Sequence, residues 1–293
     1  MSKINILAAS DDNYAQHLGV TLVSVFENTS QLENLYVKVI DGNISEENKQ
    51  KLKQVSDKYK VPIELIPFSL ENIEDYKIDG HISAAAYYRI FLPAFYKEGT
   101  DRVIYLDCDV IVNGDIADFY KLPLKNNIIG AVSEPGSSRV AEMSLKCGKS
   151  FNSGILLIDY KKWMANDVTQ KCLDFIKNHP DKIVFHDQDT MNGVLDGIWE
   201  DLPETWNYTR VHVAHNKDWK RNNFQTPPPK LVHYTNNAKP WHYYSRNPYD
   251  FLYFKYLKLS PWKGFVPYHK TFVNVLKKNI KLTMRSMGII DRL

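Results

Sequence analysis

Hydrophobic and polar residues form short blocks along the N-terminal part of the chain, and the spacing of the apolar positions changes between blocks. Helical spacing over His17–Phe26 follows a polar loop, and Ser45 followed by two glutamates is typical of a helix start. Apolar runs of strand length surround these helices at Ile4–Ala9, Leu35–Ile40 and Val61–Ile66. This strand–helix–strand–helix–strand order predicts a parallel sheet with right-handed crossovers.

Similar patterns continue further along the chain. They predict a strand at Ile155–Ile158, a helix opening at Asp159, a short helix over Thr190–Leu195 after the polar residues His186–Asp189, and an apolar segment at Leu231–Tyr234. A length of 293 residues suffices for one large α/β domain or two smaller ones. A composition that is 44% hydrophobic and 24% charged is typical of a globular protein.

The apolar run Val103–Val112 is interrupted only by Asp107, Cys108 and Asp109. If the run is one strand, both carboxylates point to the same face and need a divalent cation, because two buried anions repel each other. Alternatively, the strand ends at Leu106 and continues into a solvated turn. The acidic loop after the first strand also lies at a carboxyl end, where open parallel sheets bind ligands, so both loops predict one shared site.

Composition and motifs exclude several classes of protein. A net charge of +3 does not by itself indicate nucleic acid, and we expect no nucleic-acid partner. Three cysteines form neither a disulfide framework nor a metal quartet, which favours a reducing compartment. The first apolar run is too short for a signal peptide or a membrane span. Without G-x-G-x-x-G after the first strand or a Walker A sequence, a Rossmann dehydrogenase or P-loop ATPase is not expected.

The C-terminal segment, residues 254–293, is basic and rich in aromatic residues. Nine lysines and arginines oppose only Asp291, and apolar residues such as Phe272 and Leu276 lie between them. Such an amphipathic segment can lie on an anionic membrane surface. The alternative is a packed C-terminal helix with a solvated lysine face.

Six blocks in order resemble glycosyltransferase family 8, a retaining family with the GT-A fold that includes bacterial lipopolysaccharide-type galactosyltransferases and general-stress-protein-A-like members. The blocks are Ala8–Tyr14, His81–Arg89, Tyr105–Asp109, Phe151–Gly154, Asp187–Asp189 and His233–His242. The resemblance implies a Rossmann-like, mostly parallel sheet flanked by helices, with a smaller helical C-terminal segment. We therefore expect a catalytic domain over residues 1–250 and an attachment segment over 251–293.

The resemblance also implies roles for residues at the predicted site. Asp107, Asp109 and His233 match the family's ligands for Mn²⁺, with Mg²⁺ as a substitute; a lone His233 would otherwise be a structural histidine. The loop that holds uridine and ribose is matched by Ala9, Asp11, Asn13 and Tyr14, although Asp11 or Asp12 could equally cap the next helix. Cys108 is expected to contact the nucleotide through its backbone only. Lys239 and Asn236 match positions near the diphosphate, and the family often has glycine at the latter.

Four residues match those around the donor sugar, namely Arg89, Asn152, Asp187 and Gln188, and we expect Arg89, Asp187 and Gln188 to act in catalysis. Arg89 could otherwise be a plain ion-pair partner of Asp187. Gln188 is a poor nucleophile, which favours front-face substitution over double displacement, with Asp187 or Asp189 as the alternative nucleophiles. His81 and Glu134 fall in acceptor-side regions that vary within the family, so the identity of the acceptor does not transfer.

The resulting prediction is metal-dependent transfer of a hexose from a UDP-sugar to a glycan hydroxyl with retention. Galactose is favoured over glucose, and the glycan acceptor is a lipopolysaccharide, a glycoprotein or a cell-wall glycan. We expect a cytoplasmic protein at the periphery of the inner face of the cell membrane. Two rivals are a non-catalytic UDP-sugar-binding protein and a phosphatase of the haloacid dehalogenase type, whose D-x-D motif normally lies near the N-terminus.

Overall fold

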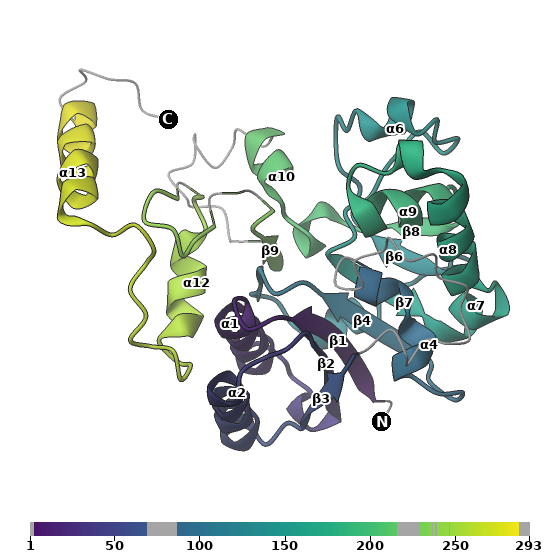
Figure 1. Cartoon of the computed structure of the whole chain (residues 1–293), viewed down its shortest axis with the longest axis horizontal. Helices are drawn as coiled ribbons and strands as arrows, with labels where there is room; N and C mark the ends of the chain where they lie inside the picture. The colour runs from purple at the N-terminus through teal and green to yellow at the C-terminus, as the bar shows by residue number, and fades with distance from the viewer. Residues whose placement is uncertain are drawn as a thin grey trace.

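A seven-stranded sheet forms the centre of the molecule, with helices on both of its faces (Figure 1). The computed structural model describes residues 3–68, 87–215, 229–235, 237, 239–245 and 247–286, with the backbone alone at 214, 215, 278, 281, 282, 285 and 286. The strand order is β3-β2-β1-β4-β7-β6-β8. The strands are β1 Ile4–Ser10, β2 Leu35–Asp41, β3 Ile63–Pro67, β4 Arg102–Leu106, β6 Ile129–Ala131, β7 Ile155–Asp159 and β8 Trp199–Asp201.

The N-terminal half of the sheet confirms the predicted parallel arrangement. Strands β3, β2, β1 and β4 are parallel neighbours, and helices α1 Ala15–Glu27 and α2 Glu46–Tyr59 connect the first three. The Ser45 side chain accepts a hydrogen bond from the backbone N–H of Asn48, so it caps α2 as its sequence predicts. Strand β7 runs antiparallel to both β4 and β6. The sheet is therefore mostly parallel, with one reversed strand among the described ones.

Alternate side chains of the strands pack into two apolar cores, one on each face of the sheet. Ile6 and Ile104 belong to the core beneath α1 and α2, whereas Leu7 and Val103 belong to the core on the opposite face. That opposite face is covered by α7 Tyr160–Ala165, α8 Val168–Asn178 and α9 His186–Val194. The Asp159 side chain accepts a hydrogen bond from the N–H of Lys162 and so caps α7. The helix predicted to open at Asp159 is thus confirmed. The helix predicted over Thr190–Leu195 is present as α9, which begins four residues earlier than expected, at His186.

The prediction of one strand through Val103–Val112 is wrong. Strand β4 ends at Leu106, residues 107–109 form a turn, and β5 Val110–Val112 pairs antiparallel with β9 Leu231–His233 in a separate two-stranded sheet. The alternative placed the end of the strand correctly, but the turn is only partly solvated: Cys108 is 8% exposed, whereas the side chains of Asp107 and Asp109 are 26% and 13% exposed. The Thr21 hydroxyl of α1 lies 2.9 Å and 2.8 Å from the carbonyl oxygens of Cys108 and Val110 and holds the turn against the helix.

Shorter elements complete the described chain. The remaining helices are α4 Leu92–Phe95, α5 Ile116–Tyr120, α6 Arg139–Glu142, α10 Arg210–His215, α12 Asp250–Leu257 and α13 Phe272–Ser286. Short 3₁₀ turns cover Leu32–Asn34, Tyr88–Ile90, Pro180–Lys182 and Glu204–Trp206.

The C-terminal helices differ in how they meet the rest of the molecule. Helix α12 packs on α1, and beyond it the Trp262 ring fills the space beside Gly19. Helix α13 projects away from the sheet (Figure 1), and Phe272 at its start is 82% exposed. Within the described residues, no helix is both long enough and apolar enough to cross a membrane.

Candidate functional site

Two carboxylates and one imidazole converge at the carboxyl end of the central strands. One ligand atom each from Asp107, Asp109 and His233 lies within 4.8 Å of the other two. The Nε2 atom of His233 is 3.1 Å from an Asp109 oxygen and 3.7 Å from an Asp107 oxygen. Strands β5 and β9 pair antiparallel, with Val110 opposite His233. This pairing places the His233 imidazole beside the two aspartates, although these residues lie far apart in the sequence. Oxygen and imidazole ligands in this number suit a divalent cation such as Mn²⁺.

The His233 ring is oriented by a residue that sequence reasoning missed. Nδ1 of His233 lies 3.1 Å from Oδ1 of the fully buried Asn207, whose Nδ2 donates to Oδ1 of Asn152 at 3.0 Å. Because the Asn207 amide nitrogen is the donor to Asn152, its oxygen accepts from His233, so Nδ1 carries the proton. The ring therefore presents Nε2 to the two carboxylates, which is the orientation that metal coordination through Nε2 requires. No local pattern around Asn207 signals this role.

Gly154 leaves the space in which the three ligand groups meet. A Cβ atom at this position would lie 2.2 Å from Cε1 of His233 and 2.4 Å from Oδ2 of Asp107. Both contacts are far below van der Waals separation, so any side chain here would displace ligands. The Gly154 carbonyl also accepts the backbone N–H of Asp107 at 2.8 Å, which joins β7 to the turn after β4. The bare backbone at Gly154 and the donor set together fit a bound divalent cation.

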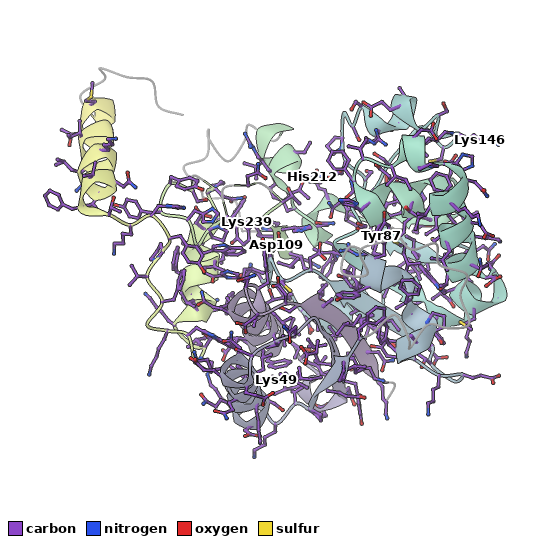
Figure 2. All side chains as sticks on the ribbon, in the orientation of Figure 1. Lys49, Tyr87, Asp109, Lys146, His212 and Lys239 are labelled. Atoms are coloured by element: carbon purple, nitrogen blue, oxygen red, sulfur yellow. The ribbon has the colours of Figure 1, made fainter. Side chains whose placement is uncertain are left out.

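Two cations balance the carboxylates. Nζ of Lys239 lies 2.6 Å from Oδ2 of Asp109, and Figure 2 shows the two side chains close together near the middle of the molecule. Burial by itself would raise the pKa of Asp109, but His233 and Lys239 outweigh burial and hold that pKa well below its usual range. An Arg89 guanidinium nitrogen is 2.8 Å from Oδ1 of Asp107. Lys239, expected near a diphosphate, therefore contacts a predicted metal ligand directly.

Arg89 also contacts Asp187, one of the residues predicted to surround the donor sugar, as the alternative interpretation expected. Its Nε is 3.0 Å from Oδ2 of Asp187, which accepts a second hydrogen bond from the Ser153 hydroxyl at 2.9 Å. Burial raises the pKa of Asp187, although the charge of Arg89 opposes the rise. Because one guanidinium spans Asp107 and Asp187, it links the predicted metal and sugar regions. The ion pair and a sugar contact are compatible roles for Arg89.

Gln188 lies in a hydrogen-bonded row with Asn152 and Glu134. Its Oε1 accepts from the side-chain amide of Asn152 at 3.0 Å and from the N–H of Ser153 at 3.3 Å. Its Nε2 donates to Oε2 of Glu134 at 3.2 Å. Burial raises the pKa of Glu134. From the sequence, Glu134 is expected only in the acceptor-side region. In the structure, its carboxylate accepts a hydrogen bond from Gln188. A carboxylate accepts hydrogen bonds and cannot donate them, so this contact fixes the orientation of the Gln188 amide.

Asp189 belongs to a different environment from Asp187 and Gln188. It is almost fully buried, pairs with Arg139 at 2.9 Å, and accepts hydrogen bonds from the backbone N–H groups of Val184 and Phe185. These contacts give Asp189 a structural role at the start of α9.

The loop over residues 9–14, which the resemblance assigns to uridine and ribose and which we call the nucleotide loop, lines a cavity of about 320 Å³ that reaches the aspartates. Ala9, Asp11 and Tyr14 line it together with Arg89 and residues 107–109. Tyr14 is 40% exposed, so part of its ring is free for contact. Ala9, Asp11 and Tyr14 therefore share one cavity with Asp107 and Asp109, whereas Asn13 and His233 are not among its lining residues.

The capping alternative for this loop is wrong, because Tyr14 occupies the N-cap position of α1 and no side chain caps that helix. Oδ1 of Asp11 accepts the N–H of Tyr14 at 2.9 Å, and Asn13 donates to the other Asp11 oxygen at 3.4 Å. Asp12 instead accepts the N–H of Ser45 and ties the loop to α2. Sγ of Cys108 donates to the Ala9 carbonyl, so this side chain is buried in the packing as expected. Asn236 and His81 lie outside the described residues.

A mostly parallel sheet with two aspartates and a histidine at the carboxyl ends of its strands defines an α/β protein with the GT-A fold. The solved galactosyltransferase LgtC, in complex with donor and acceptor sugar analogues, aligns with 90% of this chain and 98% of its own. The TM-score is 0.73, and the two sequences are 25% identical. The family model of glycosyl transferase family 8 matches residues 5–245. The chain belongs to this family and is a glycosyltransferase, as the resemblance predicted.

Two curated relatives extend the comparison. General stress protein A of Bacillus subtilis (strain 168) is 36% identical over 270 residues, which cover 88% of this chain and 94% of the relative. The lipopolysaccharide 1,2-glucosyltransferase of Escherichia coli (strain K12) is 29% identical over 287 residues, which cover 95% of this chain and 84% of the relative. The similarity therefore extends over nearly the whole length of each protein.

Proposed function

We propose that this protein transfers a hexose, with galactose favoured over glucose, from a UDP-sugar to a hydroxyl of a glycan, with retention and dependent on a divalent cation. The observation that carries the proposal is the convergence of Asp107, Asp109 and His233, two of which line the same cavity as Ala9, Asp11 and Tyr14. The names of the relatives support both donors, since one is a glucosyltransferase and one a galactosyltransferase.

The nucleotide is proposed to bind in the 320 Å³ cavity. The half-exposed Tyr14 ring offers a face for uracil, and Asp11 and Asn13 offer polar atoms for the base or ribose. Ala9 and the backbone of Cys108 complete the wall beside the diphosphate. Asn236 would join the diphosphate region, as its sequence position suggests.

Mn²⁺, or Mg²⁺ in its place, would be held by Asp107, Asp109 and His233. When bound, the cation supplies Lewis-acid stabilisation of the charge on the departing diphosphate. Lys239 is a compact cation only 2.6 Å from Asp109, so its ammonium group can add to that stabilisation. Asn207 keeps the His233 proton on Nδ1 and so keeps Nε2 available.

The donor sugar is proposed to lie against Arg89, Asn152, Asp187 and Gln188. Asp187 is tied to Arg89 and Ser153, which suits a group that orients hydroxyls better than one that attacks carbon. The Gln188 carbonyl oxygen already accepts two hydrogen bonds, which weakens it further as a nucleophile. Both observations support front-face substitution.

In that reaction the acceptor oxygen bonds to the anomeric carbon on the face from which UDP departs. The bond from that carbon to the diphosphate oxygen breaks, and the hydroxyl proton passes to a diphosphate oxygen. A glycosyl adduct trapped on Asp187 and identified by mass spectrometry would refute this mechanism.

A panel of UDP-sugars tests the function. UDP release is measured with Mn²⁺, with and without acceptor sugars, and the anomeric configuration of each product is read by NMR. We expect UDP-galactose to react fastest and the product to retain the donor configuration. Asp118→Asn, on the exposed face of α5, is a matched control for Asp109→Asn. An inverted product, or no UDP release with any donor, even by slow hydrolysis, would contradict the proposal; the latter result would favour the non-catalytic binder.

The C-terminal segment is proposed to attach the enzyme to an anionic membrane surface, at the cytoplasmic face. Four apolar side chains of α13 are at least half exposed, which favours this proposal over the packed-helix alternative: Phe272, Val273, Leu276 and Ile280. The sequence between Phe272 and Ile290 contains lysines and arginines and no acidic residue; the next acidic residue is Asp291. We expect co-sedimentation with anionic vesicles that high salt or Leu276→Asp abolishes. Equal binding to neutral vesicles would contradict the electrostatic part of the proposal.

A further inference from the structure

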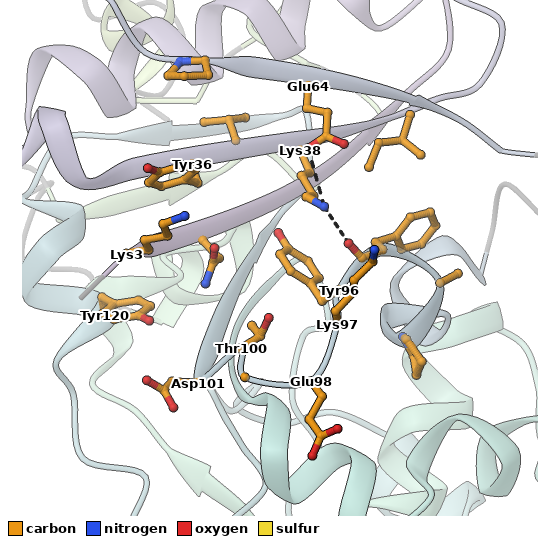
Figure 3. Close-up of a pocket in the computed structure, with 18 residues that line it drawn as sticks. Lys3, Tyr36, Lys38, Glu64, Tyr96, Lys97, Glu98, Thr100, Asp101 and Tyr120 are labelled. Carbon is orange, nitrogen blue, oxygen red and sulfur yellow. Dashed lines mark hydrogen bonds and ion pairs between the residues drawn. The ribbon is translucent and has the colours of Figure 1, made fainter.

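A second cavity, of about 840 Å³, opens at the end of the sheet opposite the nucleotide loop (Figure 3). Lys3 and Asn5, at the start of β1, line it, whereas the other end of β1 leads into the loop that holds Asp11. The segment between α4 and β4 closes the other side. The cavity therefore shares strands with the proposed catalytic site without sharing its lining residues.

The cavity exists because one face of the sheet is only partly covered. In the parallel register Asn5 lies beside Tyr36, and Lys38 lies beside Glu64, so these side chains share a face. Further along the same face, Leu7 and Ile40 are buried in apolar packing. Toward the strand starts, the described residues that cover this face are those of the short α4 and the loop after it, and polar side chains of the sheet line the cavity there.

The charges around the cavity balance. Three lysines (Lys3, Lys38 and Lys97) face three carboxylates (Glu64, Glu98 and Asp101). Lys38 donates to the Phe95 carbonyl at 2.7 Å and lies 3.5 Å from Glu64, while Asp101 pairs with Lys161 at 2.6 Å. The lining residues themselves carry no net charge that would select an anion such as a nucleotide or a lipid phosphate, although Lys161 adds one cation outside the lining. A polar but uncharged ligand is the better match.

Tyrosine rings supply the remaining chemistry. Tyr36 is 39% exposed and has Nζ of Lys3 4.1 Å from its ring centroid, so a sugar would meet this ring beside an ammonium group. Tyr96 and Tyr120 also line the cavity but are largely buried, so Tyr36 is the main aromatic surface of the three (Figure 3). A tyrosine ring offers an apolar face for the C–H groups of a pyranose, and its hydroxyl can bind sugar hydroxyls. Carboxylates and ammonium groups nearby can accept from and donate to those hydroxyls. The size of the cavity suits a ligand larger than one sugar ring.

We propose that this cavity is a second carbohydrate site that binds a neutral oligosaccharide. The inference rests on the proposed function, because the ligand is taken to be a part of the acceptor glycan remote from the reacting hydroxyl. Holding a distal part of the glycan raises the effective concentration of acceptor chains near the catalytic cavity.

Saturation-transfer NMR on the full chain tests the proposal. Four neutral tetrasaccharides are used as probes (cellotetraose, maltotetraose, chitotetraose and lacto-N-neotetraose), with UDP and Mn²⁺ present to fill the donor site. We expect at least one probe to bind, and Tyr36→Ala to weaken its affinity about tenfold. Glu98→Ala, in the exposed loop, should weaken binding as well and serves if Tyr36→Ala does not fold. Phe251→Ala, at an aromatic residue on α12 that is 55% exposed, is the matched control and should bind normally.

Three results would overturn the inference: no probe binds, Tyr36→Ala and Glu98→Ala both bind like wild type, or Asp109→Asn removes binding while the cavity variants retain it. The catalytic proposal is tested separately by UDP release, which Tyr36→Ala should leave at the wild-type rate. If the protein binds an oligosaccharide but releases no UDP, the proposed function is contradicted and the carbohydrate site is still supported. UDP release without oligosaccharide binding would contradict only the second site.

Discussion

Replacing Gly154 with alanine tests the candidate metal site without changing any ligand. The new Cβ would lie 2.2 Å from Cε1 of His233 and 2.4 Å from Oδ2 of Asp107. Since carbon atoms in contact are about 3.5–4.0 Å apart, the imidazole must retreat by roughly 1 Å or more. Metal–ligand distances tolerate only about 0.2 Å, so such a movement removes His233, Asp107 or both from the ligand set.

We expect Gly154→Ala to weaken Mn²⁺ binding by about 100-fold, the upper end of the losses seen when support for metal ligands is removed. Overpacking at this buried position should also lower the free energy of unfolding by about 1–3 kcal/mol. Calorimetric titration of Mn²⁺ into protein saturated with UDP measures the first effect, and urea denaturation measures the second. Gly264→Ala is the matched control, because a Cβ there meets no atom within 4 Å and should change neither quantity.

Wild-type Mn²⁺ affinity in a folded Gly154→Ala protein would refute this reasoning. It would mean that the cation binds elsewhere, or that His233 and Asp107 are not both needed to hold it. Unfolding of the variant without metal, followed by full recovery when Mn²⁺ and UDP are added, would also contradict the expected loss of affinity.

Three further predictions concern neighbouring groups. Glu134→Gln removes the acceptor-only partner of Gln188, so kcat should fall about tenfold with little change in the donor KM; steady-state kinetics equal to wild type would exclude this role. Arg89→Gln leaves Asp107 and Asp187 without their shared cation, so urea denaturation should show a loss of about 3–5 kcal/mol, and an unchanged midpoint would contradict it. Burial lowers the pKa of His17 to about 3, so below about pH 6.5 the unfolded chain binds a proton that the folded chain does not. Stability should therefore fall by about 2 kcal/mol between pH 7 and pH 5 in wild type relative to His17→Gln, and parallel pH profiles would argue against it.

The sequence predicted those parts of the fold that depend on local patterns. The first three strands and two helices follow from apolar spacing, and Ser45 and Asp159 mark helix starts through hydrogen bonds to residues three positions away. Such signals lie within a few residues and need no tertiary contact to be read.

The break after Leu106 could not be predicted in the same way. Leu106 and Val110 are both buried, so a continuous strand and two strands of different sheets have the same apolar pattern. The two arrangements differ in whether β5 pairs with β9, and the residues of β9 lie far along the chain from those of β5. Burial of the turn depends likewise on Thr21 from α1.

Site residues were predicted from family motifs, and their supporting contacts were not. Lys239 and Asp109 are 130 positions apart, and Gln188 and Glu134 are 54 apart, so nothing local indicates either contact. Asn207 is a further case, since its importance rests on the two side chains that it joins, His233 and Asn152. Tertiary packing alone reveals these groups.

The central claim is that Asp107, Asp109 and His233 hold a cation that transfer of the sugar requires. The most direct test is UDP release from UDP-galactose by protein stripped with a chelator and then titrated with Mn²⁺. We predict that wild type and Asp118→Asn are inactive when stripped and regain full activity with Mn²⁺, and that Asp109→Asn stays inactive at every Mn²⁺ concentration. Full activity of the stripped wild type, or Mn²⁺-dependent recovery of Asp109→Asn to the wild-type rate, would contradict the claim.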